Sequence, residues 1–263
     1  MAGIYALAQP IEAERTWIGL QRTWRMTLAR FGMTLPGTPA LDDLAGRLKA
    51  HGVAAGDPIF LRIFKREFEL ELWMMRDGRF HRFATYPICK WSGTLGPKLK
   101  QGDRQAPEGF YTVDKTALNP NSAWHRSFNL GFPNAFDRAH GRTGSFLMVH
   151  GGCGSIGCYA MTNPVIDEIW HLVTSALGGR QARFQVQVFP FRMTERNLSR
   201  HAGSPLAPFW ANLKTGYDLF EAGRIPPTVS VCDKRYAFSP GRAGDDGSAP
   251  ITARCPGGDA AAP

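Results

Sequence analysis

The chain has 263 residues, of which 43% are hydrophobic and 11% aromatic, so it can bury a core and is not globally disordered. Its formal net charge of +9 favours acidic partners, but Lys and Arg are scattered, which argues against a nucleic-acid-binding stripe. No run approaches the roughly 18 apolar residues of a membrane-spanning helix, and residues 1–10 lack the basic and apolar regions of an export signal. We therefore expect a folded chain with one main core, no nucleic-acid partner and no membrane span.

Residues 1–55 are predicted to form an N-terminal helical segment. Leu41, Leu44 and Leu48 are spaced by three and four residues, as on one face of a helix, and Gly52 follows as a stop signal. We expect this segment to be ancillary to the main domain, which we place at residues 56–192.

The main domain is predicted to open with a β-hairpin. Acidic and apolar residues alternate here with the period of a strand: Glu67, Phe68, Glu69, Leu70, Glu71 and Leu72. Asp77-Gly78 is a strong hairpin-turn signal, and residues 80–88 are predicted to be the return strand. The alternation places the acidic side chains on one face of the first strand.

The middle of the domain is predicted to alternate loop, strand and helix. Residues 89–110 contain too many Gly and Pro residues for a regular element and are interpreted as a long ordered loop. The apolar run 146–149 is predicted to be a buried strand that leads to His150. Asn163 is predicted to cap a helix that starts with Pro164, because Asn is a favoured cap and Pro a favoured first residue.

The last third of the chain is predicted to contain one more strand and a helical extension. Apolar residues alternate with Gln over 184–188, which indicates a half-exposed strand. Residues 193–242 are assigned to a C-terminal helical extension on the basis of Phe209, Trp210, Leu213, Tyr217 and Phe220. Residues 243–263 are rich in Gly, Ala, Pro and Asp and are expected to be disordered. Cys232 and Cys255, near the end, could pair.

The segment that carries chemistry runs from His150 to Cys158 and reads HGGCGSIGC. Gly151, Gly152 and Gly157 allow backbone conformations and close approaches that other residues would block. A thiol needs a base near neutral pH, so Cys158 is the candidate nucleophile and His150 the candidate general base and acid. The amide groups of Gly157 and Cys158 are expected to face a developing oxyanion. The hydroxyl of Ser155 either orders the site or belongs to a simple turn.

Other interpretations of this segment remain open from the residues alone. The number of cysteines is odd, so at least one thiol is free or bonded to another chain. Cys153 is expected to be an ordinary small buried residue. His150, Cys153 and Cys158 are also zinc-ligand types, although paired Cys-x-x-Cys ligands and the glutamate of zinc deaminases are absent. A phosphate-binding loop is disfavoured because no Gly-Lys-Ser/Thr follows the glycines.

Several motifs resemble those of YkuD-type L,D-transpeptidases. The family motif of His-Gly followed by Ser-x-Gly-Cys is present at 150–151 and 155–158. An upstream family element is similar to residues 102–111, with Ala106 in place of Thr. Residues 92–98, 128–134 and 150–153 resemble the YafK-like branch most closely, and the likeness extends over about 31–238.

The resemblance implies an α+β fold: a β-rich catalytic domain with flanking helices. It implies a thioester on Cys158, stem peptides of peptidoglycan that contain meso-diaminopimelate as partners, and a location in the periplasm or cell envelope. It implies no cofactor and no metal. Members of the YafK-like branch are associated with hydrolysis of the amide that joins the C-terminal Lys of a protein to diaminopimelate. A peptidoglycan-linked lipoprotein is therefore a further candidate partner.

Two departures from the family pattern affect the expected reaction. The stretch between His150 and Ser155 is short, and Ala160 occupies the position where typical members carry Arg. The missing guanidinium argues against ordinary transpeptidase binding of a substrate carboxylate, and the resemblance to the YafK-like branch implies water as acceptor. A true L,D-transpeptidase that crosslinks peptidoglycan or anchors protein to it, and a non-catalytic peptidoglycan-binding module, are the alternatives. Arg126, Asn134 and Arg142 are candidates for binding substrate.

Overall fold

The computed structural model describes residues 2–255, with side chains from residue 12 onward, and it has the expected α+β class. The helices are α1 (Ala2–Arg30), η1 (Leu41–Asp43), α2 (Leu44–His51), η2 (Lys115–Ala117), α3 (Ala135–Ala139), α4 (Asn163–Gly178), α5 (Glu195–Arg200) and α6 (Ala207–Gly223). The strands are β1 (Ile59–Phe64), β2 (Glu69–Arg76), β3 (Arg79–Pro87), β4 (Lys90–Trp91), β5 (Gly109–Asp114), β6 (Leu118–Ser122), β7 (His125–Asn129), β8 (Met148–His150), β9 (Tyr159–Ala160), β10 (Arg183–Phe189), β11 (Thr228–Cys232), β12 (Arg235–Ser239) and β13 (Thr252–Ala253).

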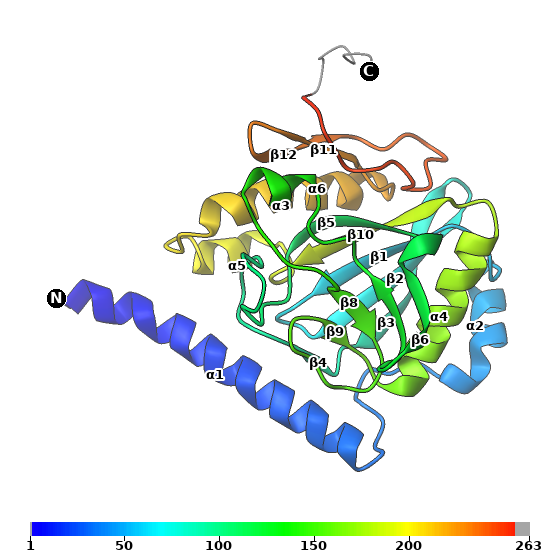
Figure 1. Ribbon diagram of the computed structural model, residues 1–263, viewed down its shortest axis with the longest axis horizontal. Coiled ribbons are helices and arrows are strands. Elements are labelled where there is room, and N and C mark those ends of the chain that lie inside the picture. Colours follow the sequence, from blue (N-terminus) through cyan, green and yellow to red (C-terminus); the bar gives the residue numbers. More distant parts are fainter. Residues whose placement is uncertain (1, 256–263) are drawn as a thin grey trace.

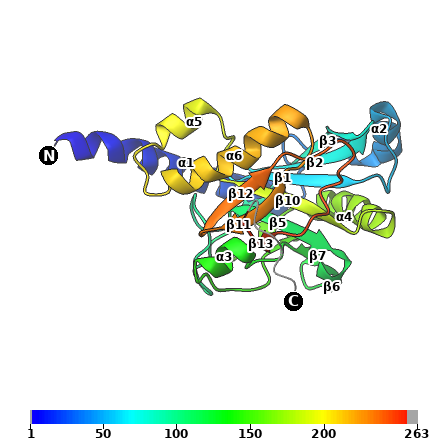
Figure 2. The same cartoon turned by 90° about the horizontal axis from the view of Figure 1, so that it is seen from above.

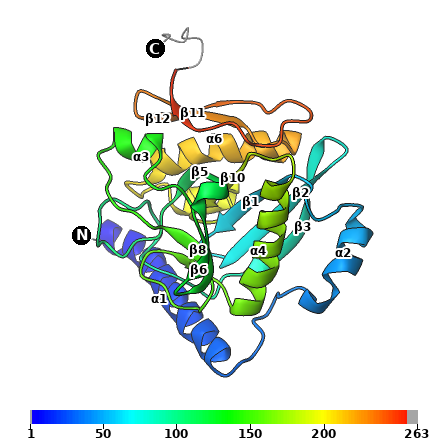
Figure 3. The ribbon, with the colours of Figure 1, turned by 45° about the vertical axis from the view of Figure 1, so that its right-hand side comes forward.

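The larger core is built on a five-stranded sheet of order β3-β2-β1-β10-β5. β1 and β10 are parallel neighbours, and the other pairs are antiparallel. Ile59, Leu61 and Ile63 of β1 pack into the main core with α4, whereas Phe64 packs with residues of α6 on the other face. Figure 3 shows α4 across one face of this sheet, and Figure 1 shows α6 beside the other. The sheet is therefore covered on both faces.

The hairpin prediction is confirmed, and the half-exposed prediction for 184–188 is wrong. Asp77 and Gly78 have φ of 53° and 74°, the left-handed pair that a tight two-residue turn requires. Gln185 and Gln187 of β10 are buried, because segments near Pro227 and Gly247 pack against this face of the sheet at Gln185. Their amides find partners inside the protein: Gln185 Nε2 donates to the Pro227 carbonyl, and Gln187 Nε2 donates to Gln185.

A second five-stranded sheet has the order β4-β9-β8-β7-β6. The segment from His150 to Cys158 connects β8 to β9 of this sheet. The long loop before β5 is ordered, as expected, and β4 belongs to it. The loop is fixed by a fully buried ion pair, in which Lys65 Nζ lies 2.8 Å from Glu108 Oε1. Glu108 also accepts from the Gly96 amide at 2.6 Å and from the indole of Trp210 at 2.9 Å. This network joins β1, the loop and α6.

The terminal segments differ in part from the predictions. α1 extends along one edge of the molecule near β4, as Figures 1 and 2 show. The C-terminal extension contains the expected helix α6 and also a hairpin, β11–β12, that was not predicted. In place of the disorder expected for 243–263, β13 pairs with β11, and residues 256–263 lie outside the described residues. Over the described chain, the helices do not combine the length and hydropathy needed to cross a bilayer.

Candidate active site

The two candidate catalytic residues lie at neighbouring parallel strands: His150 is the last residue of β8, and Cys158 directly precedes β9. Val149 of β8 pairs with Tyr159 of β9, and His150 pairs with Ala160. The loop 151–157 leaves the end of β8 and returns to the start of β9, so Cys158 lies beside the first residue of β8. The Met148 amide accordingly donates to Cys158 Sγ at 3.4 Å. Sheet register therefore brings together two residues that are eight positions apart in the chain.

Cys158 is the free thiol among the five cysteines, all of which lie in the described part of the chain. Its Sγ donates to the Phe146 carbonyl at 3.5 Å. Burial raises the pKa of the Cys158 thiol, and the Met148 amide and the charge of Lys98 offset only part of that increase. The resting group at neutral pH is therefore the thiol, which requires a base before it can attack a carbonyl.

His150 has the protonation state of a base. It is only 2% exposed, and burial lowers its pKa, while a hydrogen bond to the Gly151 carbonyl acts in the opposite direction. Nδ1 lies 2.6 Å from that carbonyl oxygen, which can only accept, so Nδ1 carries the proton and Nε2 keeps its lone pair. The Trp124 ring lies 5.6 Å from the imidazole, between ring centroids. Among the described residues, no hydrogen bond joins His150 to Cys158.

Ser155 orders the backbone of Cys158, the candidate nucleophile. Its Oγ accepts from the amides of Gly157 at 3.2 Å and Cys158 at 3.0 Å, and it donates to the Cys158 carbonyl at 2.7 Å. The hydroxyl of Ser92 donates to the Ser155 carbonyl at 2.8 Å. The expectation that the Gly157 and Cys158 amides face an oxyanion is therefore wrong for this conformation, because both amides point to Ser155.

The glycines after His150 are required by close contacts. A Cβ on Gly151 would lie 2.7 Å from Asn163 Oδ1, and Gly152 has a φ of +79°. The Gly152 amide donates to Asn163 Oδ1 at 2.8 Å. Asn163 was predicted to be the cap of α4, but Thr162 occupies that position. The side chain of Asn163 instead binds the loop 151–157 through the Gly152 amide. Gly157 is also left-handed, at +138°.

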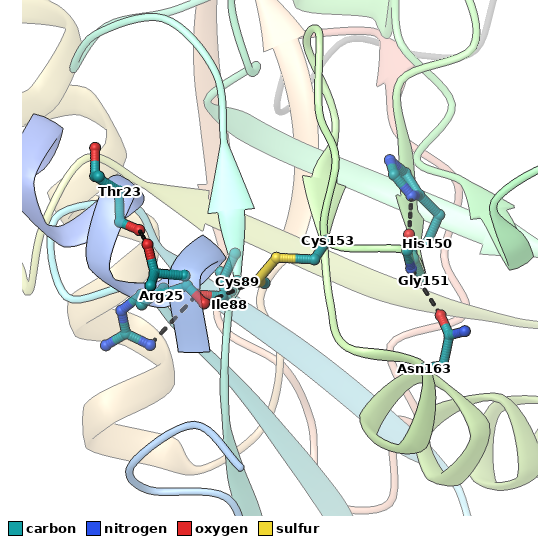
Figure 4. Close-up of a disulfide and its surroundings, with 10 residues drawn as sticks. Thr23, Arg25, Ile88, Cys89, His150, Gly151, Cys153 and Asn163 are labelled. Carbon is teal, nitrogen blue, oxygen red and sulfur yellow. Dashed lines mark hydrogen bonds between the residues drawn. A yellow bond between two sulfur atoms is a disulfide. The ribbon is translucent and has the colours of Figure 1, made fainter. Parts of the chain in front are cut away.

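Cys153 is bonded to Cys89, so the expectation of an ordinary buried thiol is wrong. The bond joins the middle of the loop 151–157 to the residue before β4, and the two cysteines are 64 positions apart in the sequence. Figure 4 shows the disulfide between α1 and the loop that carries His150 and Gly151. A bonded sulfur is not available as a metal ligand, which removes Cys153 from the zinc interpretation. Cys232 and Cys255 are also bonded, as the sequence allowed.

The candidate substrate-binding residues have structural partners. Asn134 caps α3, and its side-chain amide donates to the Phe110 carbonyl at 2.6 Å. Arg142 is largely buried, with its guanidinium 2.8 Å from Asp137. These contacts of Asn134 and Arg142 hold α3 in place. Arg126 is half-exposed, and its guanidinium lies 2.8 Å from Asp167, while its carbonyl accepts from the Gly151 amide. Arg126 thus supports the loop.

Three exposed apolar residues near Cys158 and His150 in the fold or the chain were not predicted as part of the site. Trp124, Phe146 and Ile156 are 45%, 72% and 75% exposed. Trp124 contacts His150, the Phe146 carbonyl accepts from Cys158, and Ile156 lies inside the motif. Only Ile156 carried a sequence signal, because the other two residues lie outside the motifs.

The family model described as the L,D-transpeptidase catalytic domain, YkuD, matches residues 66–205. The match includes β2 to β10, and so the whole second sheet and the segment from His150 to Cys158, whereas β1 of the first sheet precedes it. The chain therefore belongs to the YkuD family of L,D-transpeptidase catalytic domains, which act in peptidoglycan metabolism.

The chain is similar to YafK of Escherichia coli, a protein that carries the name of an L,D-transpeptidase. The sequence is 52% identical to YafK of strain K12 and to that of strain O157:H7 over 184 residues, which is 70% of this chain and 75% of either relative. Among solved structures, the helical cell shape determining protein Pgp2 of Campylobacter jejuni matches with a TM-score of 0.41 and 20% identity, over 68% of this chain and 67% of that chain. Bd1075 of Bdellovibrio bacteriovorus matches with a TM-score of 0.37 and 19% identity, over 63% of this chain and 61% of that chain.

Proposed function

We propose that the protein hydrolyses an amide bond in peptidoglycan through a thioester on Cys158, and so releases protein that is attached to diaminopimelate. The observation that carries the proposal is that a free, partly buried thiol and a buried imidazole whose Nε2 has a lone pair lie at adjacent parallel strands. These two groups supply the nucleophile and the base of acyl transfer. The reaction uses a thiol, an imidazole and water, so it requires no cofactor.

The first half of the reaction forms the thioester. His150 Nε2 takes the proton from Cys158 Sγ as the sulfur attacks the substrate carbonyl, because both groups are neutral at rest. The side chains need to move into hydrogen-bond reach for this step, and such contacts often tighten only when substrate binds. The Met148 amide and the Lys98 ammonium place positive charge near the sulfur and favour the anionic intermediate. Protonated His150 then delivers the proton to the leaving amine.

The second half removes the acyl group. His150 takes a proton from water, the resulting hydroxide attacks the thioester carbonyl, and the sulfur leaves and recovers its proton from the imidazolium. An amine in place of water would give transpeptidation by the same steps. Hydrolysis is supported by Ala160, which is buried beside His150 and offers no guanidinium to hold a second substrate.

The cysteine pairing supports an envelope location. The chain contains two disulfides, and such bonds persist in oxidising compartments such as the bacterial periplasm. Peptidoglycan lies in the same compartment, so substrate and enzyme would meet there. This agrees with the role of the family in cell-wall metabolism.

The proposal is tested with sacculi that carry covalently attached lipoprotein. Purified wild type and Cys158→Ala are incubated with them, and the released muropeptides are analysed by mass spectrometry. Loss of the Lys-containing adduct with wild type alone is the expected result. New crosslinks between diaminopimelate residues, or new adducts, would show transpeptidation instead. No change with either protein, together with retained binding to sacculi, would show a non-catalytic binding module.

A further inference from the structure

A groove of about 710 Å³ lies beside the catalytic loop, outside the Cys158 site itself. One wall is formed by the second half of α1 and residues 32–41, and the opposite wall by Gly152–Gly154 and the start of α4. We call this feature the α1 groove. It is large enough for several amino-acid residues, and the Cys89–Cys153 disulfide lies between α1 and the loop, as Figure 4 shows.

The α1 groove is an addition to the family domain. The family model matches 66–205, whereas the wall that contains Thr27, Arg30 and Met33 lies before residue 66. The other wall begins two residues after His150. The N-terminal segment, which the sequence suggested was ancillary, therefore forms a surface directly against the catalytic motif.

The side chains of the α1 groove suit a peptide that carries a carboxylate. No acidic residue lines the groove, and the described surroundings of Arg30 give its exposed guanidinium no ion-pair partner. Hydroxyls of several threonines, such as Thr27 and Thr38, and the side chain of Met33 complete a mixed polar and apolar lining. Gly152, Gly154 and the disulfide-bonded Cys153 line the opposite wall, which therefore also carries no charged side chain. A guanidinium in such a setting is well suited to bind a carboxylate.

The proposed mechanism indicates which arm of the substrate reaches this groove. His150 delivers the proton to the leaving amine, so the leaving arm lies on the His150 side of the scissile bond. If that amine is the ε-amine of a C-terminal Lys, the α-carboxylate of the same Lys remains free. A free carboxylate next to a polypeptide is the combination that the groove can accommodate.

We propose that the α1 groove binds the leaving polypeptide arm, with Arg30 paired to the α-carboxylate of its C-terminal Lys. This inference rests on the proposed function and adds to it a determinant of substrate choice. The enzyme would prefer protein attached through a C-terminal Lys to a crosslink between two stem peptides, because the α1 groove has room for several residues of polypeptide beside Gly152. Arg30 acts as a specificity residue and takes no part in proton transfer.

The test uses two synthetic substrates that differ only in the leaving arm. In both, a stem tripeptide ending in diaminopimelate is joined to the Nε of the last Lys of a hexapeptide, which ends either as a free carboxylate or as an amide. The wild-type kcat/KM is expected to be about 5- to 10-fold higher for the carboxylate, through KM, as for one charge-assisted contact at an exposed site. Arg30→Gln should remove this preference, whereas Arg15→Gln, an exposed arginine elsewhere on α1, should retain it.

A second measurement separates this inference from the proposed function. The free hexapeptide and its amide are titrated against Cys158→Ala, where the carboxylate form should bind more tightly unless Arg30 is also replaced. Differential binding without turnover by the wild type would support the groove and refute the proposed reaction. Equal binding of both peptides, or an equal loss on both substrates in Arg30→Gln, would refute the role of Arg30.

Discussion

The hydroxyl of Ser155 is bonded to both backbone groups of Cys158. It accepts from the Cys158 amide at 3.0 Å and donates to the Cys158 carbonyl at 2.7 Å, while it also accepts from the Gly157 amide. A serine hydroxyl has one donor and two acceptor positions, so Ser155 is fully used. The position of Cys158, the proposed nucleophile, thus depends on a side chain that has no part in the proposed bond-making steps.

Replacement of Ser155 should therefore lower activity with little change in the fold. Ser155→Ala removes the three hydrogen bonds to the backbone of Gly157 and Cys158, each of about 1 kcal/mol, and the resulting displacement of Cys158 should lower kcat by about 10- to 100-fold. The measurement is kcat on a diaminopimelate-linked peptide, with circular dichroism as the check on folding. Ser199→Ala on exposed α5 serves as the control. Full activity in Ser155→Ala would contradict the positioning role.

The disulfides should separate stability from activity. The double variant Cys89→Ser/Cys153→Ser frees the middle of the catalytic loop, and Cys232→Ser/Cys255→Ser removes a bond in the C-terminal sheet. Each loss should cost roughly 2–4 kcal/mol of unfolding free energy, measured by denaturant titration. Only the first variant should also lower kcat under conditions where both proteins are folded. An equal effect of both pairs on kcat would argue against a role for Cys89–Cys153 in holding the loop.

The pH dependence should reveal a neutral resting pair. Burial raises the pKa of Cys158 and lowers that of His150, so a preformed thiolate and imidazolium are disfavoured. The rate of Cys158 alkylation by iodoacetamide should keep rising above the ordinary thiol pKa. The acid limb of kcat/KM should lie below the ordinary histidine pKa, because only the neutral imidazole can take the proton. A plateau of the alkylation rate near neutral pH would indicate an ion pair instead.

Removal of one partner of the buried Lys65–Glu108 pair should strongly lower the stability of the protein. Lys65→Met leaves the Glu108 carboxylate buried without its cation and should cost about 3–5 kcal/mol of unfolding free energy. Lys65→Met/Glu108→Leu should recover part of that loss, since no unpaired charge remains. Lys214→Met is the control, because its surface pair with Asp218 contributes at most about 1 kcal/mol. A single variant as stable as wild type would contradict the account of the loop.

Sequence patterns predicted the turns and loops that depend only on neighbouring residues. The turn at Asp77-Gly78 follows from two residues that tolerate left-handed backbone, and the ordered loop before β5 follows from its Gly and Pro content. The predicted exposure of one face of β10 was wrong, because the alternation of apolar and polar residues does not show which other segments pack on that face. Gln185 and Gln187 are buried because partners from distant segments satisfy their amides.

The site was predictable only as far as the motif extends. The motif named Cys158 and His150, and the β8–β9 register places the first directly before β9 and the second at the end of β8. The bond between Cys89 and Cys153 depends on tertiary contact across the chain, and the orientation of His150 depends on one backbone carbonyl. Neither has a signature in local sequence. Asn134 and Arg142 have the residue types of a binding site, but their partners lie within the protein.

The thioester on Cys158 is tested most directly by trapping it. Wild type and Cys158→Ala are mixed with a diaminopimelate-linked peptide, quenched in acid within the first turnover and analysed by intact-protein mass spectrometry and peptide mapping. The account predicts that wild type gains the mass of the acyl stem on the peptide that contains Cys158, that hydroxylamine removes it, and that Cys158→Ala neither gains mass nor turns over substrate. Turnover by Cys158→Ala, or an acyl group on another residue, would contradict it.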